Sequence, residues 1–286
     1  MPKPFDDKVV AITGAGKGLG RAYAHYFAAL GAKVVVNNRR HDGEEKSSAD
    51  RVVEEIVSAG GDAVAEYSSV EDQTAGDKLL AFALDNFGHL DCLVANAGVT
   101  EGRSFRKQTL EEYREVLEIN LLGTVNVVHP AFRHFCDHGG GNVIVSTSSA
   151  GLFGDFGLPA YSTSKAALIG LMRSLSLEGA PKNVQVNAIA PYAATQMTAK
   201  HLSDDVSAAM LAEQVAPVVA WLASGAVNGE TLVAGGGYVA RAGMRAMVPV
   251  PVTAMDDWQA LASSPVDLDY ASAGKHFEAF VASLDL

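Results

Sequence analysis

The stretch Lys8-Val-Val-Ala-Ile-Thr13 runs directly into Gly14-Ala-Gly-Lys-Gly-Leu-Gly20, and apolar side chains then recur at helical spacing from Ala22 to Leu30. The first segment is apolar and β-branched, as is typical of a strand buried on both faces of a parallel sheet. The three glycines at 14, 18 and 20 allow a tight turn and let backbone N–H groups approach a pyrophosphate at the N-terminus of the helix. A glycine cluster between a strand and a helix predicts a dinucleotide-binding α/β fold.

A second motif combines Tyr161, Lys165 and Ser148. Residues four apart on a helix share one face, so the ammonium of Lys165 should lie near the phenol of Tyr161. A free phenol has a pKa near ~10, and a neighbouring cation would move it towards the range in which general acid–base catalysis works. Ser148 stands thirteen positions before the tyrosine and offers a hydroxyl for a substrate oxygen. The trio predicts a proton-transfer site.

Together the two motifs resemble the short-chain dehydrogenase/reductase family, and the resemblance extends over about residues 5–240. Within this family the chain is most similar to the (3R)-hydroxyacyl-CoA dehydrogenase portion of multifunctional enzymes of type 2. The closer likeness lies in Gly18–Ala24, Val34–Asn37 and Gly151–Gly157. The further motifs that appear in family order are Ala95-Asn96-Ala97-Gly98, Asn120, Ser148, Tyr161 with Lys165, and Asn187-Ala188-Ile189-Ala190-Pro191.

The resemblance implies hydride transfer between a nicotinamide cofactor and a secondary alcohol or ketone. Tyr161 would be the acid in reduction and the base in oxidation, while Lys165 would lower its pKa and bind the nicotinamide ribose. Ser148 would orient the substrate oxygen, and Asn120 would hold a water linking the lysine to solvent. The alternative is a catalytically silent cofactor-sensing or binding protein of the same fold. Such proteins usually lack the tyrosine or the lysine, and both are present here.

The cofactor should be NAD(P)(H), and one departure from the family pattern bears on which form is used. The acidic residue usual after the second strand is replaced by Asn38, followed by Arg39 and Arg40. Loss of a carboxylate removes repulsion of a 2′-phosphate, which a guanidinium can bind in bidentate fashion. This favours NADP(H) over NAD(H). The alternative is that Arg39 and Arg40 are solvated loop charges and Asn38 still holds a ribose hydroxyl.

The family pattern also gives the remaining cofactor contacts. Ser68 replaces an aspartate often found near the adenine, and Tyr192 replaces the usual glycine after Pro191. The expected cofactor-binding residues are Gly14, Gly16, Lys17, Gly18, Leu19, Gly20, Asn38, Arg39, Ser69, Val70, Asn96, Ala97, Gly98, Tyr161, Lys165, Pro191 and Thr195.

The substrate pocket is expected to have an apolar, aromatic mouth. Its candidate residues are Phe153, Phe156, Leu158 and Tyr192. Such a mouth suits a hydroxysteroid, a bulky hydrophobic ketone or a 3-hydroxyacyl chain. A coenzyme A thioester would also need basic surface for its phosphates, for which Arg103, Arg106 and Lys107 are candidates. These three can equally be plain solubility charges.

Composition excludes several other classes of function. The 286 residues carry a formal net charge of −11, whereas nucleic acid and anionic membranes usually require a basic face. The two cysteines, Cys92 and Cys136, lack the paired spacing of a metal site or disulfide framework, so we expect free thiols and no metal. No signal-peptide pattern precedes Phe5, and the final Ser283–Leu286 is not a peroxisomal address, so a cytoplasmic location is expected.

Strands alternate with helices along most of the chain, which predicts a single Rossmann-type doubly wound parallel sheet over residues 1–247. The expected strands are Val9–Thr13, Lys33–Asn37, Ala63–Tyr67, Asp91–Ala95, Asn142–Thr147, Val184–Ala188 and Thr231–Ala234. The expected helices are Arg21–Leu30, Glu44–Ser58, Thr74–Phe87, Leu110–Phe135, Ala160–Leu177 and Val215–Leu222.

Residues 248–286 are expected to form a C-terminal extension. Val248-Pro-Val-Pro-Val252 should be an extended, proline-stiffened connector. Beyond it, Phe277, Phe280, Val281 and Leu284 recur at the spacing of a helix with one apolar face. This helix should pack on its own domain or on a neighbouring subunit. The long helices beginning near Leu110 and Ala160 resemble the dimer-forming pair of the family, which implies a homodimer or homotetramer.

Overall fold

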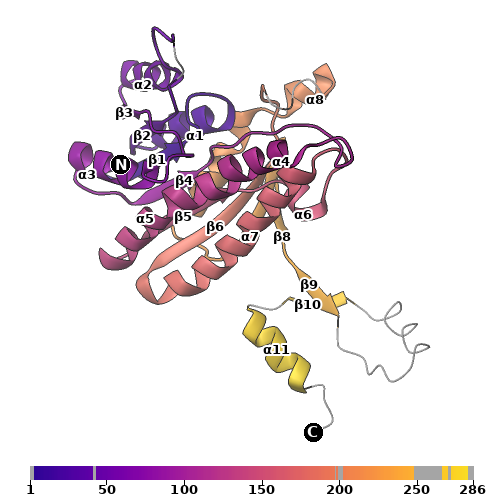
Figure 1. Ribbon diagram of the computed structural model, residues 1–286. Coiled ribbons are helices and arrows are strands. Elements are labelled where there is room, and N and C mark those ends of the chain that lie inside the picture. The colour runs from indigo at the N-terminus through magenta and orange to yellow at the C-terminus, as the bar shows by residue number, and fades with distance from the viewer. Residues whose placement is uncertain are drawn as a thin grey trace, which may run out of the picture. The chain divides into compact units, whose positions relative to one another are not determined.

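The computed structural model describes residues 3–40, 43–196, 198, 202–247, 266–269 and 272–282, and its centre is an eight-stranded sheet (Figure 1). The strand order is β3-β2-β1-β4-β5-β6-β7-β8, and neighbouring strands from β3 to β7 run parallel. The order reverses between β1 and β4, which is where ligands bind in such sheets. The strands are β1 Val9–Thr13, β2 Lys33–Asn37, β3 Asp62–Glu66, β4 Cys92–Ala95, β5 Gly141–Ser146, β6 Val184–Pro191, β7 Thr231–Gly235 and β8 Tyr238–Ala242.

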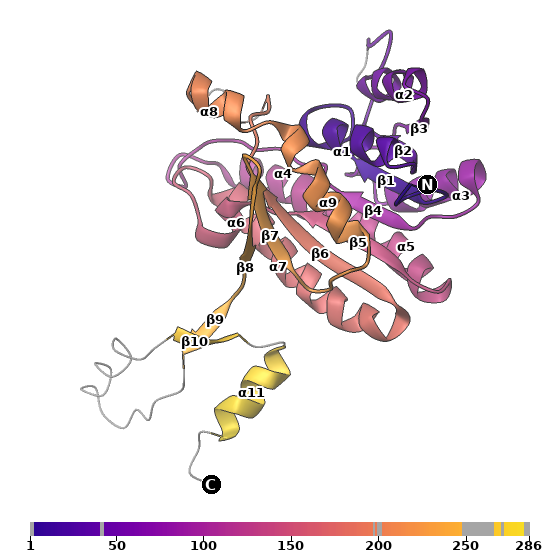
Figure 2. The same ribbon diagram turned by 180° about the vertical axis from the view of Figure 1, so that it is seen from behind.

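Helices cover both faces of the sheet, as Figures 1 and 2 show from opposite sides. Alternate residues of one strand point to opposite faces, so Val10 and Ile12 join one core cluster while Val9 and Ala11 join the other. The first cluster contains residues of α1, α2 and α9, and the second contains residues of α3, α5 and α7. The helices are α1 Gly18–Ala29, α2 Ser48–Ser58, α3 Ala75–Phe87, α4 Leu110–Leu117, α5 Gly123–Asp137, α6 Ser149–Phe153, α7 Pro159–Gly179, α8 Asp204–Ala209 and α9 Ala216–Ala223.

The predicted fold class is confirmed, with local differences in the helices. The long helix predicted over 110–135 is interrupted, because a π-helical turn at Glu118–Leu122 separates α4 from α5. The helix predicted to start at Glu44 instead starts at Ser48. Ser47 caps it: the Ser47 hydroxyl accepts a bond from the Asp50 backbone at 3.1 Å, and the Asp50 carboxylate accepts one from the Ser47 backbone at 3.0 Å. Strand β8 and the short helices α6 and α8 were not predicted.

One described stretch, Asp204–Ala223, is long and apolar enough to span a membrane, since the mean hydropathy of its 18-residue window is 1.5. The chain does not form one continuous helix there. It divides into α8, a 3₁₀ turn at Ala212–Gln214 and α9. Within α9, Val219 and Leu222 are fully buried in the same core cluster as α1. Packing against the sheet therefore accounts for the apolar character of α9.

The chain divides into two compact units, residues 1–241 and 242–286. In the second unit, β9 (Arg245–Met247) pairs antiparallel with β10 (Val266–Asp269), and α11 spans Ala273–Ala282. The predicted boundary after residue 247 lies within this second unit and stays a prediction. The connector proposed for 248–252 and Leu284 of the tail helix lie outside the described residues.

Candidate active site

The glycine loop between β1 and α1 has a backbone path that side chains would block. Gly14 and Gly18 have φ angles of +64° and +52°, in the left-handed region that glycine adopts at little cost. A Cβ atom on Gly20 would lie 2.3 Å from the carbonyl oxygen of Gly14, and one on Gly14 would lie 2.9 Å from Cα of Ala97. The loop therefore lies against both its own helix and the segment after β4, and it leads into the N-terminus of α1, which favours anions.

Two adjoining cavities run along the carboxyl ends of the strands. The first, of about 180 Å³, is lined by Gly14, Lys17, Asn37, Asn38, Arg39, Ser68, Ser69, Val70, Glu71, Ala97, Gly98, Val99 and Ile119. The second, of about 270 Å³, is lined by Gly14, Lys17, Gly18, Leu19, Gly20, Asn38, Asn96, Ala97, Gly98, Ser146, Thr147, Tyr161, Lys165, Pro191, Thr195 and Gln196. Because five residues line both, the cavities form one elongated site, which fits a ligand with two linked halves such as a dinucleotide.

Almost every expected cofactor residue lines one of these cavities. The exception is Gly16, whose added Cβ would lie 2.2 Å from the hydroxyl oxygen of Ser48, so this glycine lets α2 approach the loop. The cavity-lining residues that were not predicted as cofactor contacts are Asn37, Ser68, Glu71, Val99, Ile119, Ser146, Thr147 and Gln196. Several of these directly follow or end a strand, and that position was the signal that could have identified them.

The structure brings Tyr161, Lys165 and Ser148 together. Helix α7 begins with Pro159, so Tyr161 and Lys165 lie in its first two turns. The ammonium nitrogen of Lys165 is 5.8 Å from the centroid of the Tyr161 ring and donates a 2.7 Å hydrogen bond to the backbone carbonyl of Ser146. Ser148 caps α6, since its hydroxyl accepts a 3.2 Å bond from the Ala150 backbone, and it also hydrogen-bonds the Tyr161 side chain.

Burial is the main influence on the ionisation of both catalytic candidates. It lowers the pKa of Lys165, which is 4% exposed, to about 8. It raises the pKa of Tyr161, and the hydrogen bond with Ser148 only partly opposes this. The expected lowering of the tyrosine pKa by Lys165 is therefore wrong for this arrangement. The site holds Tyr161 as a neutral phenol, which is the form that can donate a proton.

Asn120 lies within the π-helical turn and is fully buried. Its amide oxygen accepts a 2.8 Å bond from the backbone of Val99, and its amide nitrogen donates to the Val99 carbonyl at 2.9 Å and the Ser164 hydroxyl at 3.1 Å. A Cβ on Gly98 would lie 3.0 Å from this amide oxygen and 3.3 Å from the Lys165 ammonium. Asn120 thus joins the segment after β4 to α7 beside Lys165. The water assigned to it stays a prediction.

The residues expected to choose the cofactor lie at the end of β2. Asn38 donates a 3.1 Å bond from its amide to the backbone carbonyl of Arg39. Arg39 lines the first cavity, but its guanidinium forms a 3.0 Å ion pair with Glu71. Arg40 donates to the backbone carbonyl of Glu44 at 3.3 Å and lines neither cavity. The Glu71 carboxylate that pairs with Arg39 was not predicted from the sequence.

The predicted substrate residues lie apart from the two cavities. Phe153 and Phe156 are 78% and 95% exposed, Tyr192 is partly exposed and Leu158 is half-buried. In the part of the chain that the structure describes, none of these four lines either cavity. The aromatic mouth therefore stays a prediction. Among the described residues, no group of three or more His, Cys, Asp or Glu side chains is arranged to hold a metal ion.

The basic residues considered for coenzyme A phosphates are not equivalent. Arg103 forms a 2.8 Å ion pair with Glu112, and its backbone donates a 2.8 Å bond to the carbonyl of Gly157. Arg103 therefore ties together the segments that follow β4 and α6. Arg106 and Lys107 are exposed.

Known proteins share both the sequence pattern and this architecture. The family profile described as short chain dehydrogenase matches residues 8–206. A short-chain type dehydrogenase/reductase of Mycobacterium tuberculosis is 43% identical over 241 residues, which cover 82% of this chain and 84% of that protein. The crystal structure of a short chain dehydrogenase from Mycobacterium avium has a TM-score of 0.81 at 35% identity and covers 90% of this chain and 94% of that one.

The chain also resembles part of a larger protein. Peroxisomal multifunctional enzyme type 2 of Mus musculus is 41% identical over 246 residues, which cover 84% of this chain but only 33% of that enzyme. A 3-oxoacyl-[acyl-carrier-protein] reductase of Synechocystis is 37% identical over 192 residues, covering 67% of this chain and 76% of the reductase. The chain therefore belongs to the short-chain dehydrogenase/reductase family and is an NAD(P)-dependent oxidoreductase that acts on CH–OH groups.

Proposed function

We propose that this enzyme interconverts a secondary alcohol and a ketone on a hydrophobic substrate, with Tyr161 as the general acid and base. The observation that carries the proposal is the Tyr161 side chain, which lines the second cavity and is hydrogen-bonded to the Ser148 hydroxyl. A phenol and a hydroxyl that share a hydrogen bond can both contact one substrate oxygen. The glycine loop lines the same cavity. A cofactor bound along this loop would therefore lie next to the substrate carbon that carries the reacting oxygen.

The roles of the side chains follow from this arrangement. When bound, the nicotinamide cofactor supplies or accepts the hydride. In reduction, Tyr161 would donate its proton to the substrate oxygen, and in oxidation it would remove that proton as a phenolate. Ser148 would hold the oxygen by a hydrogen bond. Lys165, fixed by the Ser146 carbonyl, would present its ammonium to the ribose.

We propose a 3-oxoacyl or 3-hydroxyacyl chain as the first substrate class to test. Hydroxysteroids and bulky hydrophobic ketones are the alternative classes. The name of the Synechocystis relative supports the acyl class, and the exposed Phe153 and Phe156 offer apolar surface. The experiment follows absorption of the reduced nicotinamide with panels of acyl thioesters, steroids and aryl ketones, using both cofactors. The proposal would be supported if the wild-type enzyme turned over at least one substrate class faster than the Tyr161→Phe variant does. Equal signals from the two proteins on every panel would contradict it.

NADP(H) should bind more tightly than NAD(H), because Asn38 carries no charge and Arg39 lines the first cavity. Arg39→Ala should therefore weaken NADP(H) binding by about 1.5–3 kcal/mol, the range for a hydrogen bond to a charged group. NAD(H) binding should scarcely change. Asn38→Asp should shift the preference further towards NAD(H) by adding repulsion against the phosphate. Dissociation constants from calorimetry measure these effects.

Arg40→Ala is the matched control for this experiment, since Arg40 follows Arg39 directly but lines neither cavity. It should leave the dissociation constants of both cofactors unchanged. Wild-type preference for NAD(H), together with unchanged constants in Arg39→Ala, would show that Arg39 is only a solvated charge.

The protein should form a homodimer or homotetramer. Leu110 at the start of α4 and Leu122 in the π turn are 68% and 45% exposed, which is apolar surface on helices suited to an interface. Light scattering at micromolar concentration should give two or four times the chain mass of 29.9 kDa. A mass of one chain at that concentration would contradict this prediction.

A further inference from the structure

An ion pair between Arg39 and Glu71 forms part of the lining of the first cavity. Arg39 and Glu71 both line this cavity, and one guanidinium nitrogen lies 3.0 Å from Oε2 of the carboxylate. The two side chains are 49% and 39% exposed, so water screens the pair, and separating it costs little. Any anionic group that binds Arg39 must share the guanidinium with Glu71 or displace it.

We propose that Glu71 sets the balance between the two cofactors by competing with the 2′-phosphate of NADP(H) for Arg39. This inference rests on the proposed contact between Arg39 and that phosphate. Glu71 lies on the segment between β3 and α3, lines the same cavity as Asn38, and supplies a carboxylate that position 38 lacks. In this protein the carboxylate beside the proposed adenosine site is therefore carried by the segment between β3 and α3, whereas the family usually has an acidic residue at the end of β2.

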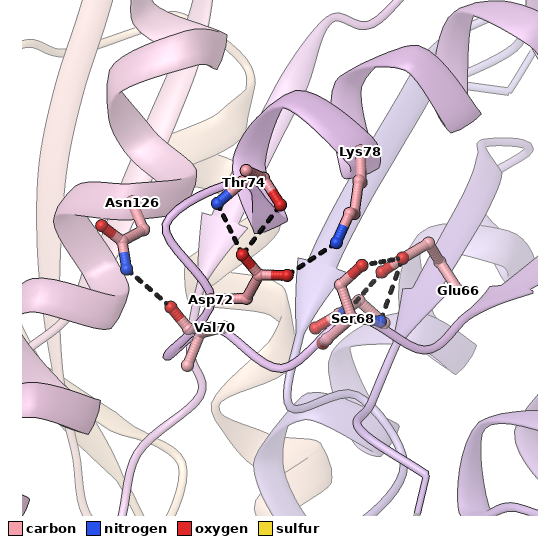
Figure 3. A network of polar contacts seen from close by, with 8 residues as sticks. Glu66, Ser68, Val70, Asp72, Thr74, Lys78 and Asn126 are labelled. Carbon is pink, nitrogen blue, oxygen red and sulfur yellow. Dashed lines mark hydrogen bonds and ion pairs between the residues drawn. The ribbon is translucent and has the colours of Figure 1, made fainter.

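Glu71 is the fixed member of the pair, because the segment that carries it is tied down on both sides (Figure 3). Before Glu71, the backbone and hydroxyl of Ser68 donate hydrogen bonds to the Glu66 carboxylate at 3.0 and 2.6 Å. The carbonyl of Val70 accepts a 2.9 Å bond from the side chain of Asn126.

After Glu71, the Asp72 carboxylate accepts bonds from Thr74 and Lys78. The Thr74 backbone and hydroxyl lie at 2.8 Å and the Lys78 ammonium at 2.6 Å.

The Glu71 carboxylate is also held directly. The hydroxyl of Ser69 donates a 3.0 Å bond to Oε2, the same oxygen that pairs with Arg39. The long Arg39 side chain therefore pairs with a carboxylate that the Ser69 hydroxyl already holds in place. In this arrangement Glu71 determines where Arg39 points.

The two cofactors should respond differently to this carboxylate. A 2′-phosphate bound to Arg39 brings a charge near −2 close to Glu71, and the two like charges repel although Arg39 attracts both. The 2′-hydroxyl of NAD(H) is neutral and can donate a hydrogen bond to a carboxylate oxygen. Glu71 should therefore weaken NADP(H) binding and leave NAD(H) binding nearly unchanged, so that the preference for NADP(H) is moderate and both cofactors are used.

Glu71→Gln tests this directly, because glutamine keeps the size of the side chain and an oxygen that can accept from Ser69. Calorimetric titration of the enzyme, without substrate, should show NADP⁺ binding about tenfold more tightly than in wild type, close to the lower end of the range for a hydrogen bond to a charged group. NAD⁺ binding should change by less than about twofold. The gain for NADP⁺ should shrink as salt is added, since the two groups are partly exposed.

The control is Glu54→Gln, since Glu54 is also an exposed glutamate paired with a cation, Lys46, but lines neither cavity. It should leave both constants unchanged. In the Arg39→Ala background, Glu71→Gln should strengthen NADP⁺ binding by only about two- to threefold, because loss of repulsion then remains as its sole effect. An equal gain in both backgrounds would overturn the proposed competition for Arg39.

Failure of this inference can be told apart from failure of the proposed cofactor preference. If Glu71→Gln leaves the NADP⁺ constant unchanged, or strengthens both cofactors equally, Glu71 has no role in the choice, whatever Arg39→Ala does. If wild type prefers NAD⁺ but Glu71→Gln strengthens NADP⁺ alone, the proposed preference is wrong and the role of Glu71 stands.

Discussion

Tyr161→Phe should reduce turnover by about 10²- to 10⁴-fold in both directions, the usual contribution of a positioned general acid or base. The ring is kept, so packing around it should persist, but the proton that the substrate oxygen needs is lost. Cofactor dissociation constants should stay within about twofold of wild type. Steady-state kinetics with the best substrate of the panels and calorimetry with each cofactor measure the two effects.

The pH dependence provides a second test of the same residue. Burial raises the pKa of Tyr161, so its neutral form predominates at neutral pH. Reduction needs the neutral phenol and should hold its rate until pH approaches the raised pKa, whereas oxidation needs the phenolate and should become faster as pH rises. Tyr161→Phe should lose both dependences. Turnover within tenfold of wild type would contradict the assignment of Tyr161.

Gly20→Ala should weaken binding of both cofactors by about a hundredfold or more. The added methyl carbon would lie 2.3 Å from the Gly14 carbonyl oxygen and 2.8 Å from Cα of Ala15, and backbone atoms of a buried turn cannot move aside cheaply. The loop must shift, so its N–H groups leave the positions that a pyrophosphate requires. Overpacking should also cost about 1–3 kcal/mol of unfolding free energy. Calorimetry and thermal unfolding follow the two effects.

Gly170→Ala is the matched control for this substitution. Gly170 is an exposed residue of α7, and a Cβ atom built on it has no neighbour within 4 Å. Alanine there should stabilise the helix by up to about 1 kcal/mol and leave cofactor binding unchanged. Wild-type affinity for both cofactors in Gly20→Ala would show that the close approach at this turn is not required for binding.

The fold was predictable where one local pattern decided the structure. The boundaries of β1 and β2 agree with the prediction because each is a short apolar run between a polar residue and a turn. The start of α2 was wrong by four residues because Glu44 extends a helical pattern, whereas the Ser47 cap sets the actual first turn. Strand β8 was missed because four of its five residues are exposed, so it lacks the apolar pattern of a buried strand.

The candidate site was predictable from motifs but its electrostatics were not. Spacing placed Tyr161 and Lys165 on one helix face, yet the direction of the tyrosine pKa shift depends on burial, which spacing does not reveal. The partner of Arg39 was missed for a related reason. Glu71 lies 32 residues further along the chain, and only the pairing of β2 with β3 brings the two segments together.

Because a π-helical turn joins α4 to α5, the number of residues in this turn constrains the structure as much as their identity does. Such a turn accommodates one residue more than an α-helical turn, so it behaves as a single-residue insertion. Deleting one residue from Glu118–Leu122 would let an uninterrupted α-helix form, and α5 would keep its orientation relative to α4, because the wide turn already absorbs the extra residue. The wide turn that carries Asn120 would be lost, so its amide would leave the position from which it binds the backbone of Val99. Homologues should therefore vary freely in residue type on the exposed side of this turn but should not tolerate a gap within it.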